Sequence, residues 1–263
     1  MATRVDHFMY AVPSLEDGMS WASEIFGIEA AYGGEHVGLG TRNALMSLGR
    51  AYLEIIAPDP AQPHEGNFGE TLSALSEGGL VTWCAEGALS KIAANLKEQG
   101  IKTVGPNRTK RSTSDGKLLE WELLFPTGSP FLGCMPFFID WLDCDNPKDT
   151  TPLAGEFQSL SISTPQAPGL SNILDNLGLD IPVNDGARSL PILVSPQFKA
   201  RAASQRIQLA RSLVACFASW APDWVQSALK HGSQHGHRPT NATSRAREQK
   251  QTRNQDLLYR QWA

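Results

Sequence analysis

The order of secondary-structure signals repeats once within the first 145 residues, and this repeat limits the fold more than any other feature of the chain. A β-rich run over 7–12 leads into a helix whose predicted N-cap is Ser14 and whose predicted stop is Gly27. Three strand-like runs follow at 28–32, 43–48 and 51–56, separated by turn signals at Gly33-Gly34 and Gly49-Arg50. The first copy therefore has the order strand, helix, strand, strand, strand.

The same order returns after a short predicted linking helix at 68–75. A strand over 80–85 and an amphipathic helix over 88–99 precede strands at 101–104, 118–125 and 136–141, with Asp115-Gly116 as a hairpin-type turn. An internal repeat of about 75 residues indicates a duplicated supersecondary unit. The sequence thus predicts an α+β fold in which residues 1–150 form paired βαβββ modules with a mixed sheet.

Two further segments follow the repeat. Residues 151–196 are predicted to be a partial third module of βαβ type, because a helical pattern at 169–177 lies between strand-like runs. From residue 197 onward, eleven basic residues face three acidic ones, a net charge of +8, whereas the whole chain carries −4. The first 196 residues must then carry −12, and this shift marks a boundary. We expect 197–263 to be a basic extension, helical at 202–218 and disordered at 231–253, which is almost wholly polar.

Composition narrows the class of protein. Hydrophobic residues make up 41% and charged residues 19% of the chain, as in ordinary soluble globular proteins. The net charge of −4 gives no general reason to expect nucleic acid or an anionic membrane as a partner. The N-terminus lacks the pattern of a signal peptide, and no stretch approaches the roughly 20 apolar residues of a membrane span. With four scattered cysteines, we expect a cytoplasmic protein with free thiols.

Acidic residues occupy otherwise apolar strands in both copies of the repeat. When AYLEIIAP is superimposed on FFIDWLD, Glu54 stands against Asp140. A buried carboxylate is costly without a partner or a metal ion, so both residues are candidates for one shared site. His7 alone fits a strand-end histidine bonded to backbone, but with two carboxylates it makes a donor set for a divalent ion. We therefore expect His7, Glu54 and Asp140 to hold Zn²⁺, Mn²⁺, Fe²⁺, Ni²⁺ or Mg²⁺.

A polar loop between two predicted strands is a candidate for substrate binding. Its sequence is HVGLGTRN, and its polar side chains are His36, Thr41, Arg42 and Asn43. The glycines allow close backbone approach, and these side chains can hydrogen-bond a small anionic or carbonyl-bearing substrate. A plain solvent-facing turn is the alternative.

The strands of the second module contain tryptophans and glutamates that could also belong to the site. Core packing is the first interpretation of the tryptophans, and lining of an apolar substrate pocket is the second, for which Trp83 and Trp141 are the candidates. Two glutamates flank Trp121, and an inward-facing one is a reserve candidate for a general base or a ligand. Glu122 therefore joins Glu54 as a candidate catalytic carboxylate.

Three runs, DHFMYAVPSLEDG, GGEHVGLGTRNALMSLGRAYLEIIAPDP and PFFIDW, resemble the glyoxalase-like branch of the vicinal-oxygen-chelate superfamily. The resemblance covers residues 5–145 closely and 155–195 weakly. It implies that the paired modules curl into a cup, whose first and last strands hold a divalent metal ion. It also implies that this ion binds two neighbouring substrate oxygens and stabilises an enolate or a similar anion. His7 and Glu54 match the ligand positions of the first module, and Asp140 matches one in the second.

The fourth ligand position departs from the pattern of this superfamily. Val81 or Thr82 stands where the family has a His or Gln-type ligand. Two functions therefore stay open. One is a metal-dependent lyase, isomerase or dioxygenase-type enzyme that acts on a small oxygen-rich molecule. The other is a metal-free protein of the same fold that binds or sequesters a small molecule, and for either function a homodimer is conceivable.

Overall fold

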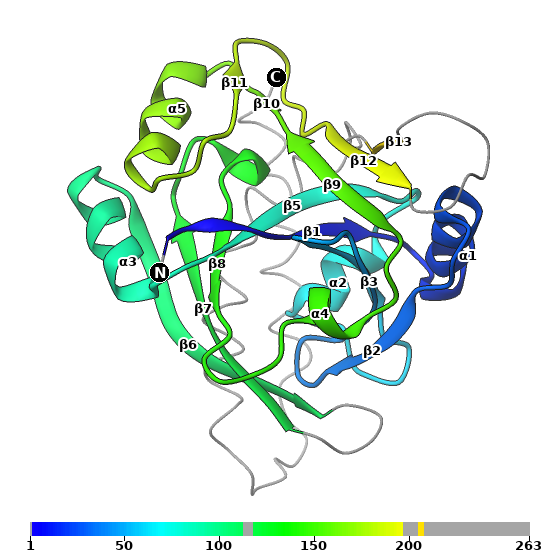
Figure 1. The fold of residues 1–263 in the computed structure, drawn as a ribbon. Helices are drawn as coiled ribbons and strands as arrows, with labels where there is room; N and C mark the ends of the chain where they lie inside the picture. The colour runs from blue at the N-terminus through cyan, green and yellow to red at the C-terminus, as the bar shows by residue number, and fades with distance from the viewer. Residues whose placement is uncertain (1, 113–117, 197–204, 208–263) are drawn as a thin grey trace, which may run out of the picture. The chain divides into compact units, whose positions relative to one another are not determined.

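The computed structural model describes residues 2–112, 118–196 and 205–207 (Figure 1). Eight strands form its main sheet: β1 (Arg4–Ala11), β2 (Ala31–His36), β3 (Thr41–Ser47), β4 (Tyr52–Pro58), β5 (Gly79–Glu86), β6 (Lys102–Ser112), β7 (Leu118–Thr127) and β8 (Phe137–Asp140). Between them lie α1 (Leu15–Phe26), α2 (Phe68–Ser73), α3 (Leu89–Glu98) and the 3-10 helix η1 (Leu132–Cys134).

The main sheet consists of two modules side by side, in the strand order β2-β3-β4-β1-β5-β8-β7-β6. β1 and β5 run antiparallel at its centre, and each also pairs in parallel with the last strand of its own module, β4 or β8. The sheet curls so far that its edge strands, β2 and β6, have Cα atoms within 8 Å of each other. The predicted pair of βαβββ modules and the curved mixed sheet are thereby confirmed, as a half-barrel.

Alternate residues of each strand face opposite sides of the sheet, as the strand repeat requires. On the outer face, Phe8 and Trp83 are fully buried in the main core. On the inner face, Tyr52 and Trp141 belong to a second apolar cluster. Because both faces of the central strands are covered, β4 is buried over nearly its whole length, including the charged residue Glu54.

The helices pack on the sheet, and α1 has both caps that the sequence predicted. Helix α1 covers β3 and β4, and α3 covers β6, β7 and β8. Ser14 Oγ accepts a hydrogen bond from the backbone N–H of Asp17 at 3.2 Å, and Gly27 ends α1 with a φ of 72°. An L residue with a side chain would be strained at that angle. Helix α2 packs against β4 and buries Phe68 and Leu72.

Residues 151–196 continue the chain on the outer side of the sheet's centre. After α4 (Pro147–Thr150), β12 (Ile192–Pro196) pairs with both β9 (Gly155–Leu160) and β13 (Gln205–Ile207) in an antiparallel sheet of the order β13-β12-β9. Helix α5 (Ala167–Asn176) lies between β10 (Ile162–Ser163) and β11 (Val183–Asn184), which form a short parallel pair. Figure 1 shows β9 crossing the central strands β1 and β5.

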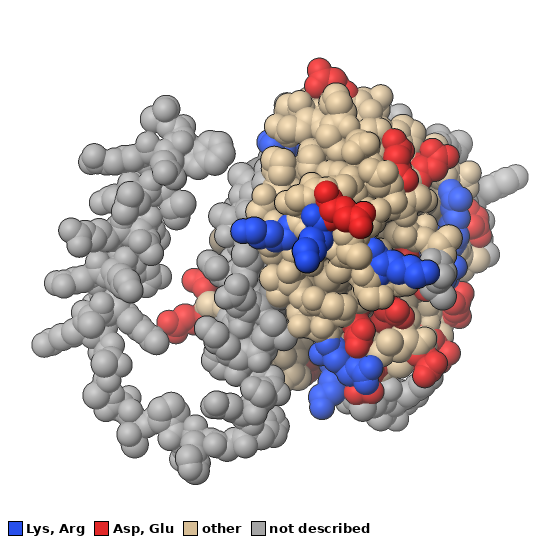
Figure 2. All heavy atoms as spheres, turned by 90° about the vertical axis from the view of Figure 1, so that its left-hand side faces the viewer, with Lys and Arg blue, Asp and Glu red and all other residues tan. Residues whose placement is uncertain are grey.

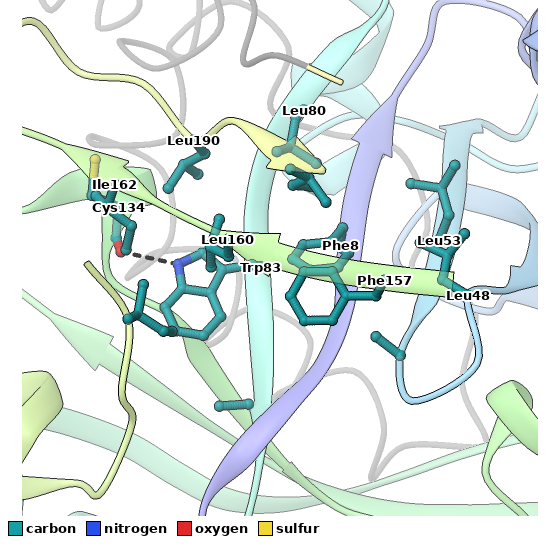
Figure 3. Close-up of a cluster of buried hydrophobic side chains, with 14 of the residues drawn as sticks. Phe8, Leu48, Leu53, Leu80, Trp83, Cys134, Phe157, Leu160, Ile162 and Leu190 are labelled. Carbon is teal, nitrogen blue, oxygen red and sulfur yellow. Dashed lines mark hydrogen bonds between the residues drawn. The ribbon is translucent and has the colours of Figure 1, made fainter. Parts of the chain in front are cut away.

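The contact between this segment and the main sheet is aromatic. The centroid of the Phe157 ring of β9 lies 5.0 Å from that of the Phe8 ring of β1. The Arg50 guanidinium lies over the Phe157 ring, with Cζ 4.8 Å from its centroid. Figure 3 shows Phe8 and Trp83 in this cluster, with the indole N–H of Trp83 donating to the Cys134 carbonyl at 3.0 Å. The outer side of the central strands is therefore filled, and a cavity can form only on the inner side.

Two of the predicted segments are wrong. Gly33 and Gly34 do not form a turn, because β2 runs through them with an irregular pairing between Tyr32 and Gly34. Glycine in a strand often marks such a bulge, and the chain turns only after His36. Gln205–Ile207 form β13 along the edge of β12 instead of lying in the helix expected at 202–218. The rest of that helix, the 231–253 stretch and the Asp115-Gly116 turn lie outside the described residues.

Charges of both signs mix on the surface of the described residues. Figure 2 shows Lys and Arg side chains interspersed with Asp and Glu side chains on one face. Ion pairs include Arg4 with Glu86 at 2.8 Å and Arg42 with Glu16 at 2.9 Å. Among the described residues, no helix has the length and apolarity that crossing a membrane requires.

We expect Phe157→Ala to lower the free energy of unfolding by about 3–5 kcal/mol, because it removes a buried ring and leaves a cavity against Phe8. Urea denaturation followed by far-UV circular dichroism measures the change. Val37→Ala is the control: this side chain is 87% exposed, and the expected change is below about 0.5 kcal/mol. A Phe157→Ala effect as small as that of the control would contradict the packing of 151–196 on the sheet.

Candidate functional site

The inner face of the half-barrel encloses a cavity of about 190 Å³. Most of its wall is aromatic or aliphatic. The imidazole and carboxyl groups on the wall gather at one side and come from strands of the first module: His7, His36 and Glu54. A mostly apolar cavity with a few converging polar groups is the usual form of a small-molecule site.

A β-bulge in β1 builds one part of the polar group. The pairing of β1 with β5 shifts between Val5 and His7, so Asp6 is the extra residue. In a regular strand Asp6 and His7 would face opposite sides, but the bulge lets their side chains meet, with Asp6 Oδ1 2.7 Å from His7 Nδ1. Asp6 Oδ2 accepts from the Trp141 indole N–H at 3.1 Å and from the Asn146 amide at 2.7 Å.

The contact with Asp6 decides how His7 presents its ring. An ionised carboxylate only accepts hydrogen bonds, so Nδ1 carries the proton and Nε2 presents its lone pair. His7 Nε2 lies 3.6 Å from Glu54 Oε2. The ring is held from both sides, stacked on Tyr52 at 4.6 Å and met edge-on by Phe137 at 5.3 Å. His7 is 4% exposed and Glu54 6% exposed, so the pair is shielded from bulk water.

A second set of contacts fixes Glu54. The Asn43 amide donates to Glu54 Oε1 at 2.6 Å and lies 3.3 Å from His36 Nε2. His36 Nδ1 is 2.9 Å from Thr41 Oγ, and its Nε2 is 4.0 Å from Glu54 Oε1. Thr41, His36, Asn43 and Glu54 therefore form a polar chain along β2, β3 and β4. Because Asn43 occupies Oε1, Oε2 is the oxygen of Glu54 that faces His7.

The structure brings together only part of the predicted loop site. His36 and Asn43 line the cavity, whereas Thr41 supports His36 from behind. Arg42, one residue on along β3, points to the opposite side, where it pairs with Glu16 of α1 at 2.9 Å. The strand alternation explains this split, since Asn43 faces inward and Arg42 cannot.

The predicted residues of the second module divide in the same way. Trp141 lines the cavity, and so does Trp121, which had not been selected. Trp83 lies on the outer face in the main core, where it packs with Phe8 instead of facing a substrate. Glu122 also faces away from the cavity, with Arg108 at 3.6 Å.

The structure does not bring Asp140 to His7 and Glu54. Its Oδ1 accepts from the backbone N–H of Leu142 at 2.9 Å, and it is not among the described residues that line the cavity. Strand register explains the difference. Glu54 pairs with Met9 of β1, and the corresponding pair in the second module is Phe137 with Cys84. The superposition of Glu54 on Asp140 is therefore wrong by three residues, and an odd shift turns a side chain to the other face.

Cys84 stands beside the polar group without adding a reactive thiolate. Ligand atoms of Asp6, His7 and Cys84 all lie within 4.8 Å of one another. Burial raises the pKa of the Cys84 thiol well above its usual range, and the nearby acidic side chains of Asp6 and Glu54 raise it further. Both oxygens of Asp6 already accept hydrogen bonds. Asp6 and Cys84 do not line the cavity, so we describe this trio as packing behind its wall and not as a metal site.

Sequence reasoning missed Asp6, Asn146 and Trp121. Asp6 directly precedes His7, but strand alternation places neighbours on opposite faces, so only the bulge could reveal the contact. Asn146 is 140 positions away from Asp6 in the chain. Trp121 was recognised as a strand residue, and the correct inward direction of β7 would have selected it in place of Glu122.

A half-barrel of paired βαβββ modules with an inner polar group defines the class of fold, and comparison defines the family. Residues 5–178 match the family described as glyoxalase-like domain. The match spans more than half of the chain, which therefore belongs to this family. A search of curated proteins gave no match.

Solved structures are similar to this chain at low sequence identity. A hypothetical protein from Staphylococcus aureus matches with a TM-score of 0.56 and 18% identity, over 78% of this chain and 85% of that one. A Streptomyces coelicolor methylmalonyl-CoA epimerase variant in complex with 2-nitronate-propionyl-CoA has a TM-score of 0.41 and 18% identity, over 56% of this chain and 100% of that one. The methylmalonyl-CoA epimerase from Mycobacterium tuberculosis has a TM-score of 0.36 and 17% identity, over 52% and 85%.

We expect Cys84 and Cys134 to resist alkylation in the folded protein. The thiolate is the reactive form, and burial raises the pKa of Cys84 well above its usual range and that of Cys134 to about 11. At pH 8 both thiols are therefore protonated, and Cys134 gains thiolate only as the pH approaches 11. Iodoacetamide labelling from pH 7 to 10, read by peptide mass spectrometry, tests this against urea-unfolded protein. Labelling of folded Cys84 at the unfolded rate would contradict the buried site.

Proposed function

We propose that the protein is an enzyme that holds a divalent metal ion through His7 and Glu54 and acts on a small oxygen-bearing molecule. The reaction class is that of a lyase, isomerase or dioxygenase. One observation carries the proposal: His7 Nε2 and Glu54 Oε2 lie 3.6 Å apart on the wall of a mostly apolar cavity. Few arrangements other than a metal ion or a shared proton justify burying these two groups together.

The donor chemistry fits a divalent ion. Imidazole nitrogen and carboxylate oxygen suit Zn²⁺, Mn²⁺, Fe²⁺ and Ni²⁺, and a site with few protein donors leaves positions open for water or substrate. The contact of His7 Nδ1 with Asp6 is the type of outer contact that metal-binding histidines commonly have. His36 Nε2, 4.0 Å from Glu54 Oε1, adds a further nitrogen near the pair.

Each polar residue has a separate task in this proposal. Asp6 keeps the proton on His7 Nδ1, so that Nε2 presents a lone pair. Asn43 holds Glu54 Oε1 and thereby directs Oε2 toward the cavity, where it can hold an ion or take a proton from a bound substrate. A bound divalent ion would supply Lewis-acid stabilisation of negative charge on a substrate oxygen. The apolar wall excludes water and so strengthens these interactions.

A second function, metal-free binding of a small molecule, is favoured by one observation. In the second module, Thr82 and Phe137 occupy the places that correspond to His7 and Glu54. Of the four strand positions that the two modules offer, two therefore carry no strong metal ligand. The same cavity without an ion would bind its ligand through hydrogen bonds and apolar contact alone.

We expect the purified full-length protein, prepared without chelators, to contain about one divalent ion per chain by inductively coupled plasma mass spectrometry. His7→Ala should lose this ion because it removes a nitrogen donor, and Glu54→Gln should bind it much more weakly because a neutral amide oxygen replaces the carboxylate. Asp6→Asn should bind it about 10–100-fold more weakly, because the outer contact orients His7. His64→Ala and Glu35→Gln are matched controls outside the cavity, and Asp140→Asn should also keep the ion because Asp140 contacts Leu142.

The opposite results separate the two functions. Metal-free protein, with unchanged stability in His7→Ala and Glu54→Gln, would exclude the metal-dependent enzyme. A thermal-shift screen of small molecules in the presence of EDTA tests the second function, since a ligand that binds the folded state raises the melting temperature without metal. Stabilisation that needs the ion supports the enzyme instead.

A further inference from the structure

We propose that the molecule bound in the cavity is uncharged, with a ring system at one end and a carbonyl or hydroxyl oxygen at the other. This inference rests on the proposed function, because it names the kind of substrate that the same cavity accepts. Three properties of the described residues lead to it: the charge around the polar group, the placement of the aromatic rings and the size of the cavity.

The charge around the polar group disfavours an anion. Among the described residues that line the cavity, none is Lys or Arg. Two buried acidic residues, Asp6 and Glu54, lie on either side of His7. A divalent ion would balance two carboxylates and leave no surplus positive charge. A phosphate, carboxylate or CoA group inside the cavity would then be buried without a cation, which is costly.

Most of the aromatic rings on the cavity wall come from the second module, whereas the polar group comes from the first. The polar residues His7, His36 and Glu54 come from the first module, and so does Tyr52, while Phe68 belongs to α2. The other four of the six Phe, Tyr and Trp residues on the described wall come from the second module: Trp121, Phe125, Phe137 and Trp141. Trp121 and Trp141 are 5.5 Å apart with their planes at 44°, and Phe125 and Phe137 stack at 5.5 Å and 11°. Such faces favour a flat ring by stacking and edge contacts.

The size of the cavity agrees with a small ring system. A cavity of about 150 Å³ admits benzene, and the cavity here measures about 190 Å³. The ring would lie among the aromatic residues of the second module. The oxygen would point to His7 and Glu54, where an imidazole and a carboxyl group of the described residues meet. A hydroxyl group can donate to Glu54 Oε2 or His7 Nε2, whereas a carbonyl oxygen, which only accepts, would be held there by a bound divalent ion.

The test compares two single-ring probes of similar size and different charge, acetophenone and benzoate. Each is titrated at pH 8 into the full-length protein, once after EDTA treatment and once loaded with Mn²⁺, with tryptophan fluorescence and calorimetry as readouts. We expect the neutral ketone to bind at least about tenfold more tightly in both preparations, because the anion must be desolvated without a cation. Glu54→Gln should narrow this ratio by improving the binding of benzoate.

Matched tryptophan variants locate the ring. Trp121→Leu should weaken ketone binding about three- to tenfold, because it removes an aromatic contact. Trp21→Leu is the control, since Trp21 stacks on Tyr10 and does not line the cavity. Equal or tighter binding of benzoate, tight binding of free coenzyme A, or no binding of the ketone would each overturn the proposal. A protein without metal would overturn the proposed reaction, yet would leave the preference for the ketone standing.

Discussion

The carboxylate of Asp6 is buried where the two modules meet and accepts hydrogen bonds from three side chains. His7 lies beside it on β1, Trp141 follows β8, and Asn146 caps α4. Asp6 is 1% exposed, so each of these contacts offsets part of a large desolvation cost. Removing the carboxylate would leave three buried donors without an acceptor, and each such donor lowers the free energy of unfolding by about 1–3 kcal/mol. The site therefore depends on a contact between distant parts of the chain.

The bulge at Asp6 connects this contact to the chemistry of the cavity. Without the extra residue, His7 and Asp6 would lie on opposite faces, and nothing would select the tautomer of His7. With it, one carboxylate both ties the modules together and aims His7 Nε2 at Glu54. Bulges are common beside active sites because they redirect a side chain in this way.

The sequence could predict the strand and helix order because hydrophobic periodicity and capping residues act locally. Ser14 and Gly27 lie at the ends of α1 where the sequence placed them. Strand faces were harder to predict, since they depend on register. The superposition that matched Glu54 to Asp140 was three residues off, and this assigned Asp140 to the inner site. Glu122 was selected separately, as a neighbour of Trp121, and both carboxylates face away from the cavity. Gly33-Gly34 shows a similar difficulty, because glycines in a sequence can indicate either a turn or a bulge within a strand.

The two modules carry different residues at equivalent places in the cavity. Strand register places Thr82 and Phe137 where the first module has His7 and Glu54. Two identical halves would offer a bound molecule two equivalent orientations, related by the symmetry of the repeat. Because one half carries the imidazole and carboxyl groups and the other carries most of the aromatic rings, the two orientations differ in energy. Burying an oxygen among Trp121 and Phe137 would lose its hydrogen bonds, and that loss costs about 1–3 kcal/mol. In the proposed function, a single orientation would hold the reacting oxygen beside Glu54 in every binding event, and such fixed positioning would be a large part of the catalysis.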